Sequence, residues 1–343
     1  MHKPVFHYFR LPILAFVLAV IAAFIIAGPA MAITVAVLAI LEVSLSFDNA
    51  VVNAHVLENW DEKWRKIFLT WGILIAVFGM RLLFPIAIVS VAAHMSPVDA
   101  TVMALTDPAK YAATLTGVHY MVAAFGGVFL LKVGLTHFLD KEKDHHWLGP
   151  IERFLSKIGM LDSAEIMIVL IAVLALAGLL PADERYGYIF AGALGLVTYL
   201  ATKAVGTLAT GGGDVADKVI KAGIGGFIYL EVLDASFSFD GVIGAFALTN
   251  NIIWITVGLF VGAFAVRELT LLAVDRGTLQ AYPHLEHGAF WAIIALGGLM
   301  LISPVFEVPE WITGLLGAII IGAAFITSLI ENKKQADGLL ASA

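Results

Sequence analysis

The chain has 343 residues, of which 60% are hydrophobic and only 14% are charged. Together with a mean hydropathy of +0.94, this composition excludes an ordinary soluble domain, in which roughly a quarter of the residues are charged. The net charge of −7 is modest, and the sequence has no basic run that would suggest nucleic acid as a partner. No cysteine occurs, so disulfides and thiolate metal sites are excluded, and a bound metal would be held by oxygen or imidazole.

Apolar runs long enough to cross a bilayer, which needs about 20 apolar residues per helix, recur along the chain. The sequence predicts ten of them, near residues 11–27, 31–56, 67–93, 118–137, 164–180, 187–203, 221–249, 252–274, 287–303 and 311–330. The first run also imitates a signal peptide with a small-residue site at 30–32, but it is long for one, and we retain it as a span. We therefore predict an all-α polytopic membrane protein with about ten transmembrane helices.

The distribution of Lys and Arg orients these spans. If the N-terminus is cytoplasmic, fifteen of these residues fall in inside segments, and only Lys110 and Arg185 fall in outside loops. This positive-inside bias predicts that both termini lie in the cytoplasm. The three remaining basic residues, Arg81, Lys132 and Arg267, fall within spans, and Lys132 is expected to snorkel toward the cytoplasmic interface.

Two copies of one polar motif interrupt the apolar runs. "LEVSLSFDNA" at 41–50 is matched by "DASFSFDGVI" at 234–243, and both copies read acid-x-Ser-x-Ser-Phe-Asp. An arginine follows in the next span of each half, Arg81 after the first copy and Arg267 after the second. The alignment pairs Glu42 with Asp234, Ser44 with Ser236, Ser46 with Ser238, Asp48 with Asp240 and Asn49 with Gly241.

The repeat divides the chain into two related halves, residues 1–181 and 182–343, each with five spans. Because the two motifs lie on the second and seventh spans, an odd number of crossings separates them and they run in opposite directions. Such inverted repeats build transporters whose site lies near the bilayer midplane, between the halves.

The four acids of the motifs need an explanation. At about 2.5 to 3.5 kcal/mol for each ionised acid at a helix centre, they would cost roughly 10 to 14 kcal/mol. A divalent cation offsets this cost, since carboxylates, hydroxyls and amide carbonyls are hard oxygen ligands suited to Mg²⁺, Ca²⁺ or Mn²⁺. Crowded, desolvated carboxylates also hold protons when the site is empty, and metal would then expel them. Metal/proton exchange is therefore our hypothesis.

The spacing within each motif allows two backbone conformations, an interrupted helix or a continuous one. Polar residues recur with period two, whereas a continuous helix would turn Glu42 and Asp48 about 120° apart. A short unwound segment would aim both at one place, and a continuous helix with locally bonded side chains is the alternative. Glu231, one turn before Asp234, is either a further ligand or proton acceptor or a partner in a structural hydrogen bond.

The two arginines have open roles too. Arg81 and Arg267 are candidate counter-ions or gating residues for the acid cluster, although Arg267 has a local alternative in Glu268. Among the histidines, His55 follows Asp48 by seven residues and could relay protons. Glycines in "GGVFLLKVG" and "GALGLV" indicate close helix packing.

The motif "LEVSLSFDNAVV", with "LEVLDASFSFDGVIGAFALT", "GLFVGAFAVREL" and "YPHLEHGAFWAI", resembles the TerC family, named for tellurium resistance, and especially its longer bacterial branch. The resemblance covers roughly residues 40–330. It implies metal-ion transport across the bacterial cytoplasmic membrane, most often discussed as manganese efflux, with Glu42, Asp48, Asn49, Asp234 and Asp240 as ligands. Gly241 departs from it, because family members commonly have Ser or Asn there. The loops 94–117 and 138–163 also depart and receive no role.

The expected function is therefore a secondary transporter, not an enzyme, that exports a divalent cation in exchange for protons. Mn²⁺ is favoured and Ca²⁺ is the alternative, as transported ligand rather than permanently bound cofactor. Besides the ion, protons and the lipid bilayer, no partner is identified, and oligomeric state stays open. A membrane protein that loads metal onto exported enzymes fits the same site. An intramembrane aspartyl protease would also use two facing aspartates, but it would not need doubled serines and further acids.

Overall fold

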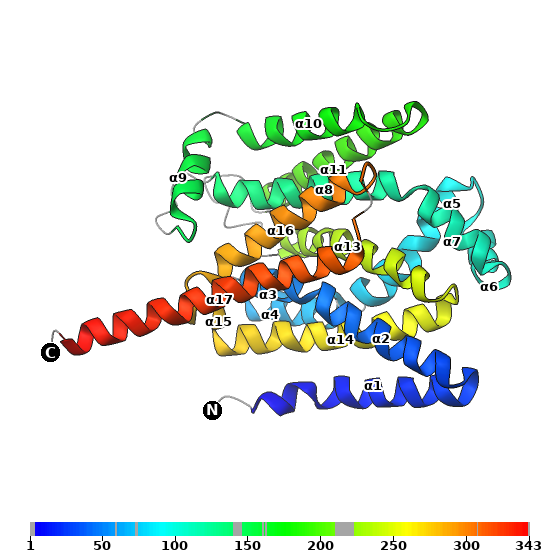
Figure 1. The fold of residues 1–343 in the computed structure, drawn as a ribbon, viewed down its shortest axis with the longest axis horizontal. Coiled ribbons are helices and arrows are strands. Elements are labelled where there is room, and N and C mark those ends of the chain that lie inside the picture. Colours follow the sequence, from blue (N-terminus) through cyan, green and yellow to red (C-terminus); the bar gives the residue numbers. More distant parts are fainter. Residues whose placement is uncertain are drawn as a thin grey trace.

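The computed structural model describes residues 4–58, 60–72, 75–139, 146–159, 161, 163–209, 223–306 and 308–341. Every regular element in this part of the chain is a helix (Figure 1). Six of these helices are long and apolar enough to cross a membrane, and two bent helix pairs raise the number to eight if each pair is one span. A helical, multi-pass membrane protein is therefore confirmed.

The N-terminal helices form a hairpin with a bent second arm. Helix α1 (Val5–Ala27) and helix α2 (Pro29–Leu45) meet at Gly28, whose φ of 88° lies in the region that favours glycine. Pro29 then begins α2, where its missing N–H costs nothing. Helix α3 (Phe47–Glu58) continues the direction of α2 after a bend of 48°.

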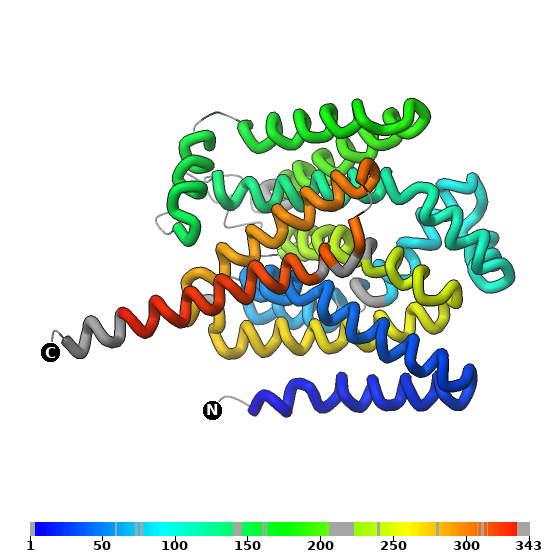
Figure 2. Tube along the Cα trace, viewed as in Figure 1, coloured from blue at the N-terminus to red at the C-terminus, as the bar shows by residue number. Residues whose placement is uncertain are grey.

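Short pieces make up the next part of the chain: α4 (Glu62–Ile67), the π-helical segments η1 (Phe68–Gly72) and η2 (Ile75–Leu83), α5 (Phe84–Ala92), α6 (Pro97–Thr106) and α7 (Pro108–Gly117). A bend of 106° separates the η2–α5 segment from α6. Helices α6 and α7 occupy the loop that received no role from the sequence, and they lie together at one end of the molecule (Figure 2).

The remaining helices are α8 (His119–Phe138), α9 (Gly149–Ile158), α10 (Ala164–Ala177), α11 (Ala182–Ala209), α13 (Gly223–Leu248), α14 (Ile252–Arg276), α15 (Thr278–Ala281), α16 (Leu285–Ile302) and α17 (Glu310–Ala341). Each of the ten predicted spans coincides with a helix or a bent run of helices. However, α10 has only 14 residues and α13 carries three acids, and neither is among the spans that length and composition identify.

Helix α8 lies at the centre, where it packs on α11, α13 and α16. Glycines permit this contact, because a Cβ added to Gly127 would lie 2.8 Å from the carbonyl oxygen of Gly297. A Cβ on Gly195 of α11 would likewise collide with the carbonyl of Phe125. The prediction that these glycine runs serve close helix packing is confirmed.

Lys132 of α8 does not snorkel, so that prediction was wrong. Its side chain is buried and its Nζ lies 3.1 Å from Glu165 Oε1 of α10. Nζ also donates a hydrogen bond to Thr136 and lies 4.4 Å from the centre of the Tyr199 ring. A carboxylate, a hydroxyl and an aromatic face thus replace the water that snorkelling would have reached.

Candidate functional site

The two motif copies lie against each other in opposite directions. Asn53 Nδ2 of α3 donates a hydrogen bond to Asp234 Oδ1 of α13 over 2.9 Å. A Cβ placed on Gly241 of α13 would lie 3.3 Å from Glu42 Oε2 of α2. Glu42 precedes Asn53 in the sequence, whereas their partners Gly241 and Asp234 come in the reverse order. The two segments are therefore antiparallel.

The backbone differs between the copies. In the first copy, Ser46 has φ −105° and ψ 14°, and the 48° bend lies at this residue. Asp48 therefore lies in the first turn of a new helix, where a negative charge is favoured by the helix dipole, and its Oδ1 accepts a hydrogen bond from the N–H of Asn49. The second copy lies within the continuous helix α13. Of the two alternatives that the period-two spacing allows, the first copy has the interrupted helix and the second copy has the continuous one.

Glu42 forms a buried ion pair. Its carboxylate contacts the Arg81 guanidinium of η2 and accepts a hydrogen bond from Ser46 Oγ over 2.9 Å. The carboxylate and the guanidinium are both almost completely buried. Gly262 of α14 makes room for this side chain, because an added Cβ would collide with Glu42 and lie 2.7 Å from the Ala39 carbonyl. Arg81 is thus brought to the acid motif, as the counter-ion hypothesis expects.

Asp234 lines a small cavity together with Asn49 and Asn53. Asn49 and Asn53 both hydrogen-bond its carboxylate. Their own Oδ1 atoms are buried and accept no hydrogen bond. The cavity measures about 40 Å³, enough for a cation or a few waters. It is lined by Asn49, Asn53, Phe68, Leu69, Arg81, Asp234, Ala263, Val266, Arg267 and Thr270.

Two further predicted acids, Asp48 and Glu231, do not line this cavity. Asp48 is buried and faces Gly317 of α17, where an added Cβ would lie 3.0 Å from Asp48 Oδ2. Glu231 is buried, and neither of its carboxylate oxygens has a hydrogen-bond partner. It faces the π-helical segment, since a Cβ on Gly72 would lie 2.7 Å from Glu231 Oε1. Asp240 belongs to α13, but its side chain lies outside the described residues.

The four serines do not act alike. Ser46 bonds Glu42, whereas Ser238 is buried and its Oγ has no hydrogen-bond partner. Ser236 Oγ donates to the Val232 carbonyl of its own helix. Ser44 is exposed and lies in a groove with α1 and α14, away from the acids. Three of these four serines are therefore buried, and one of them, Ser46, bonds an acid of the motif, whereas Ser44 is exposed.

Arg267 lines the cavity but has local partners. Its guanidinium lies 2.7 Å from Glu268 Oε1 and donates two hydrogen bonds to the Leu69 carbonyl, over 3.0 and 2.7 Å. Leu69 belongs to the π-helical segment η1, whose wider turns displace carbonyls from the regular helical pattern. Arg267 thus satisfies a backbone group next to the cavity.

Asn53, which hydrogen-bonds Asp234, was not among the ligands predicted from the sequence. The signal was present, because Asn53 follows Asn49 by four residues and so lies on the same helix face. Among the described side chains, no three His, Asp or Glu residues come close enough together to hold a metal ion. The cavity's cation ligands would therefore be two amide oxygens and one carboxylate.

Neither the curated proteins nor the solved structures contain a significant match to this chain. One family model matches residues 47–335, a range that includes Asp48 and the whole second motif and begins five residues after Glu42. Because this match covers most of the chain, the protein belongs to the family described as "Protein of unknown function (DUF475)".

Proposed function

We propose that the protein is a secondary transporter that exports a divalent metal cation, Mn²⁺ in the first place, in exchange for protons. One observation carries the proposal: the two motifs lie antiparallel beside a cavity that Asp234, Asn49 and Asn53 line. The amide oxygens of Asn49 and Asn53 are buried and have no hydrogen-bond partner. Buried acceptors without donors cost about 1 to 3 kcal/mol each, and a cation bound between them would remove that cost.

The ligand chemistry agrees with a hard cation. Every candidate ligand in the cavity is an oxygen, and the sequence contains no cysteine. Mn²⁺ and Ca²⁺ both accept carboxylate and amide oxygens, so these ligands fit either ion. The resemblance to the TerC family favours Mn²⁺, which is why we place it before Ca²⁺. Mg²⁺ is less suited, since it gives up its hydration water reluctantly.

The arrangement of helices supports ten spans in two inverted halves. Several contacts of one half have a counterpart in the other: α1 with α2 corresponds to α11 with α13, α8 with α10 to α16 with α17, and α3 with α16 to α13 with α8. We propose α10 and α13 as the two spans beyond the eight, with both termini in the cytoplasm of a bacterial cell. Alternating access around a site between such halves is a known transport design.

In this proposal, protons bind to carboxyl groups while no metal cation is bound. Glu231 is buried without a hydrogen-bond partner, and an isolated ionised carboxylate costs several kcal/mol in such surroundings. We therefore expect Glu231 to carry a proton while the cavity is empty and to lose it when metal binds nearby. Glu42, by contrast, has a charged partner in Arg81.

Metal flux into proteoliposomes under an imposed pH gradient tests the proposal, with Mn²⁺, Ca²⁺, Mg²⁺ and Zn²⁺ compared. We expect saturable Mn²⁺ flux that is lost in Asp48→Asn, Asp234→Asn and Asp240→Asn. Asp183→Asn, an exposed acid on α11, is the control and should transport normally. Retained metal binding with no flux of any ion would instead identify a metal-loading partner or a sensor.

A further inference from the structure

Helix α9 lies in the loop 138–163, to which the transport proposal gives no role. It runs across the direction of α8 and α10 and lies at the end of the molecule toward which both chain termini extend (Figures 1 and 2). Helices α8 and α10, which it connects, run along the length of the bundle. A helix lying across the spans at their ends is placed where a membrane surface would be.

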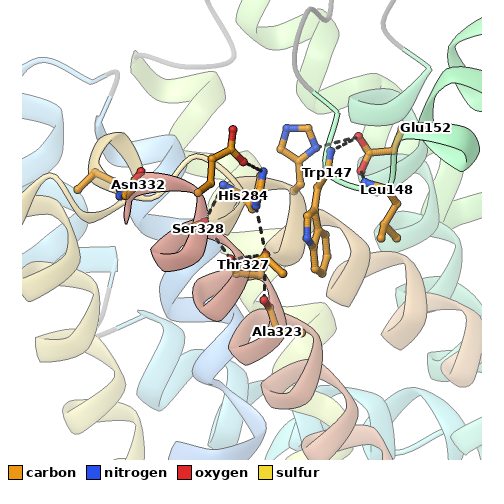
Figure 3. A network of polar contacts seen from close by, with 12 residues as sticks. Trp147, Leu148, Glu152, His284, Ala323, Thr327, Ser328 and Asn332 are labelled. Carbon is orange, nitrogen blue, oxygen red and sulfur yellow. Dashed lines mark hydrogen bonds and ion pairs between the residues drawn. The ribbon is translucent and has the colours of Figure 1, made fainter. Parts of the chain in front are cut away.

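The inner side of α9 is attached through one buried acid. Glu152 is 1% exposed, and its carboxylate accepts hydrogen bonds from Trp291 Nε1 of α16 over 3.0 Å and from the N–H groups of Trp147 and Leu148. Its Oε2 also lies 3.0 Å from His287 Nδ1 of α16. Figure 3 shows Glu152 beside Trp147 and Leu148, just ahead of α9. This carboxylate therefore joins the backbone just before α9 to α16.

The outer side of α9 carries exposed apolar side chains. Ile151 is 51% exposed and Phe154 is 62% exposed, and their spacing of three residues places them on one side. Leu161, just beyond the helix, is 59% exposed. Exposed apolar groups of this size cost free energy in water at roughly 25 cal/mol per Å². The same groups are favourable at the boundary between lipid headgroups and acyl chains.

A basic strip lies beside this apolar side. Arg153 and Lys157 are exposed and four residues apart, so they share a second side of the helix. Trp147, directly before α9, stacks on His284, and Trp291 bonds Glu152. Tryptophan is enriched at the headgroup level of membranes. Basic, apolar and tryptophan side chains thus occur together at one end of the bundle.

We propose that α9 is a membrane-surface helix that binds anionic phospholipid: Ile151 and Phe154 enter the headgroup boundary, and Arg153 and Lys157 contact the phosphates. Glu152 joins this lipid-bound helix to α16. The proposal rests on the multi-pass fold and on the surface of α9, and it stands apart from the identity of any transported ion. Its partner is an anionic lipid layer, as in the cytoplasmic leaflet.

The absence of cysteine from the sequence permits a direct test, because one introduced cysteine can carry a fluorophore without background. The fluorophore is placed at position 154 by Phe154→Cys and, as the control, at the exposed position 183 by Asp183→Cys. Both proteins are reconstituted in bilayers of phosphatidylcholine and phosphatidylglycerol. We expect nitroxide-labelled lipid to quench the label at 154 and aqueous iodide to quench the label at 183. Equal iodide quenching at both positions would overturn the proposal.

The anionic preference is tested by comparing quenching with nitroxide-labelled phosphatidylglycerol and nitroxide-labelled phosphatidylcholine. We expect the phosphatidylglycerol to quench the label at 154 more strongly. Arg153→Gln combined with Lys157→Gln should lower that preference by about five-fold for each basic side chain removed. Equal quenching by the two lipids, or a preference unchanged in the double variant, would show that α9 does not recognise anionic lipid.

Discussion

At the scale of single residues, the ion pair between Glu42 and Arg81 dominates the site. Removing one partner of a buried pair leaves an uncompensated charge and costs about 3 to 5 kcal/mol, whereas removing both costs much less. Arg81→Gln should therefore destabilise the protein strongly, and Glu42→Gln combined with Arg81→Gln should regain most of the loss. Chemical denaturation in detergent measures this cycle, and additive effects of the two changes would contradict the pairing.

Asn53 provides a second prediction at this scale. Asn53→Ala removes one hydrogen bond to Asp234 and one free oxygen of the cavity. We expect the affinity for Mn²⁺, measured by equilibrium binding, to fall about ten-fold, which corresponds to about 1.4 kcal/mol. Asn251→Ala, at the exposed start of α14, is the control and should bind normally. Unchanged affinity in Asn53→Ala would place the cation elsewhere.

The sequence predicted much of this site at the residue scale, because a carboxylate is rare enough in an apolar run to be noticed. Glu42, Asp234 and Glu231 are buried as expected, and Arg81 reaches Glu42. Ser44 faces α1 because α2 is still a regular helix there, and two residues along a helix turn a side chain about 200° away from Glu42. Period-two spacing left both an interrupted and a continuous helix open, and it could not predict that the first copy is interrupted while the second is continuous.

At the scale of elements, the packing of α14 on α2 depends on a missing side chain. An alanine at Gly262 would collide with Glu42, and we expect Gly262→Ala to cost about 1 to 3 kcal/mol through overpacking. Gly298→Ala is the matched control, because nothing lies within 4 Å of its added Cβ. Thermal unfolding in detergent compares the two variants, and equal melting temperatures would refute this close contact.

The attachment of α9 should depend on pH. Burial alone raises the pKa of Glu152, but hydrogen bonds from His287, Trp291 and the Leu148 N–H outweigh it and lower the pKa from 4.5 to about 2. Because the folded pKa is the lower one, this stability is present above pH 4.5 and is lost as the pH falls toward 2. At about 1.4 kcal/mol per pKa unit, the loss is at most about 3.5 kcal/mol.

In Glu152→Gln, the melting temperature should fall less than in wild type as the pH is lowered from 4.5 toward 2. His146 and His287, which both lie near the Glu152 carboxylate, are unchanged in this variant. Asp183→Asn is the control, and it should keep the wild-type dependence. A slope that is the same in Glu152→Gln as in wild type would mean that the fastening of α9 to α16 does not depend on this carboxylate.

Several short helices could have been predicted from the sequence but were not. Ser96 and Asp107 cap α6 and α7, and a proline occupies the first position of each helix. This cap-then-proline pattern is a standard helix start. The search for long apolar spans passed over it, since helices of ten residues cannot cross a bilayer. The π-helical turns before Arg81 had no comparable signal, because apolar composition does not distinguish π from α turns.

At the scale of the whole molecule, the orientation of the spans is the next prediction. The cysteine-free chain permits single cysteines at the exposed positions Asp183 and Lys333. A maleimide that cannot cross the membrane should label Asp183→Cys in intact cells and Lys333→Cys only after lysis. Labelling of both positions in intact cells would contradict ten spans with cytoplasmic termini.

Hydropathy predicted the helical class and a helix at each expected span, because lipid imposes length and polarity on every crossing. It could not establish ten crossings, since α10 is short and α13 carries the acids that the proposed function needs. The opposite directions of the motifs were predicted from the parity of spans, and the neighbouring pairs Asn53–Asp234 and Glu42–Gly241 run in opposite directions as well.

The proposed exchange has metal and protons crossing the membrane in opposite directions through one protein. It is tested most directly by recording the internal pH of proteoliposomes while a Mn²⁺ gradient is imposed in the absence of any pH gradient. We predict that Mn²⁺ entry drives protons out, and that Asp234→Asn abolishes both movements while Asp183→Asn preserves both. Mn²⁺ entry without any change of internal pH, or proton movement that persists in Asp234→Asn, would contradict exchange through this site.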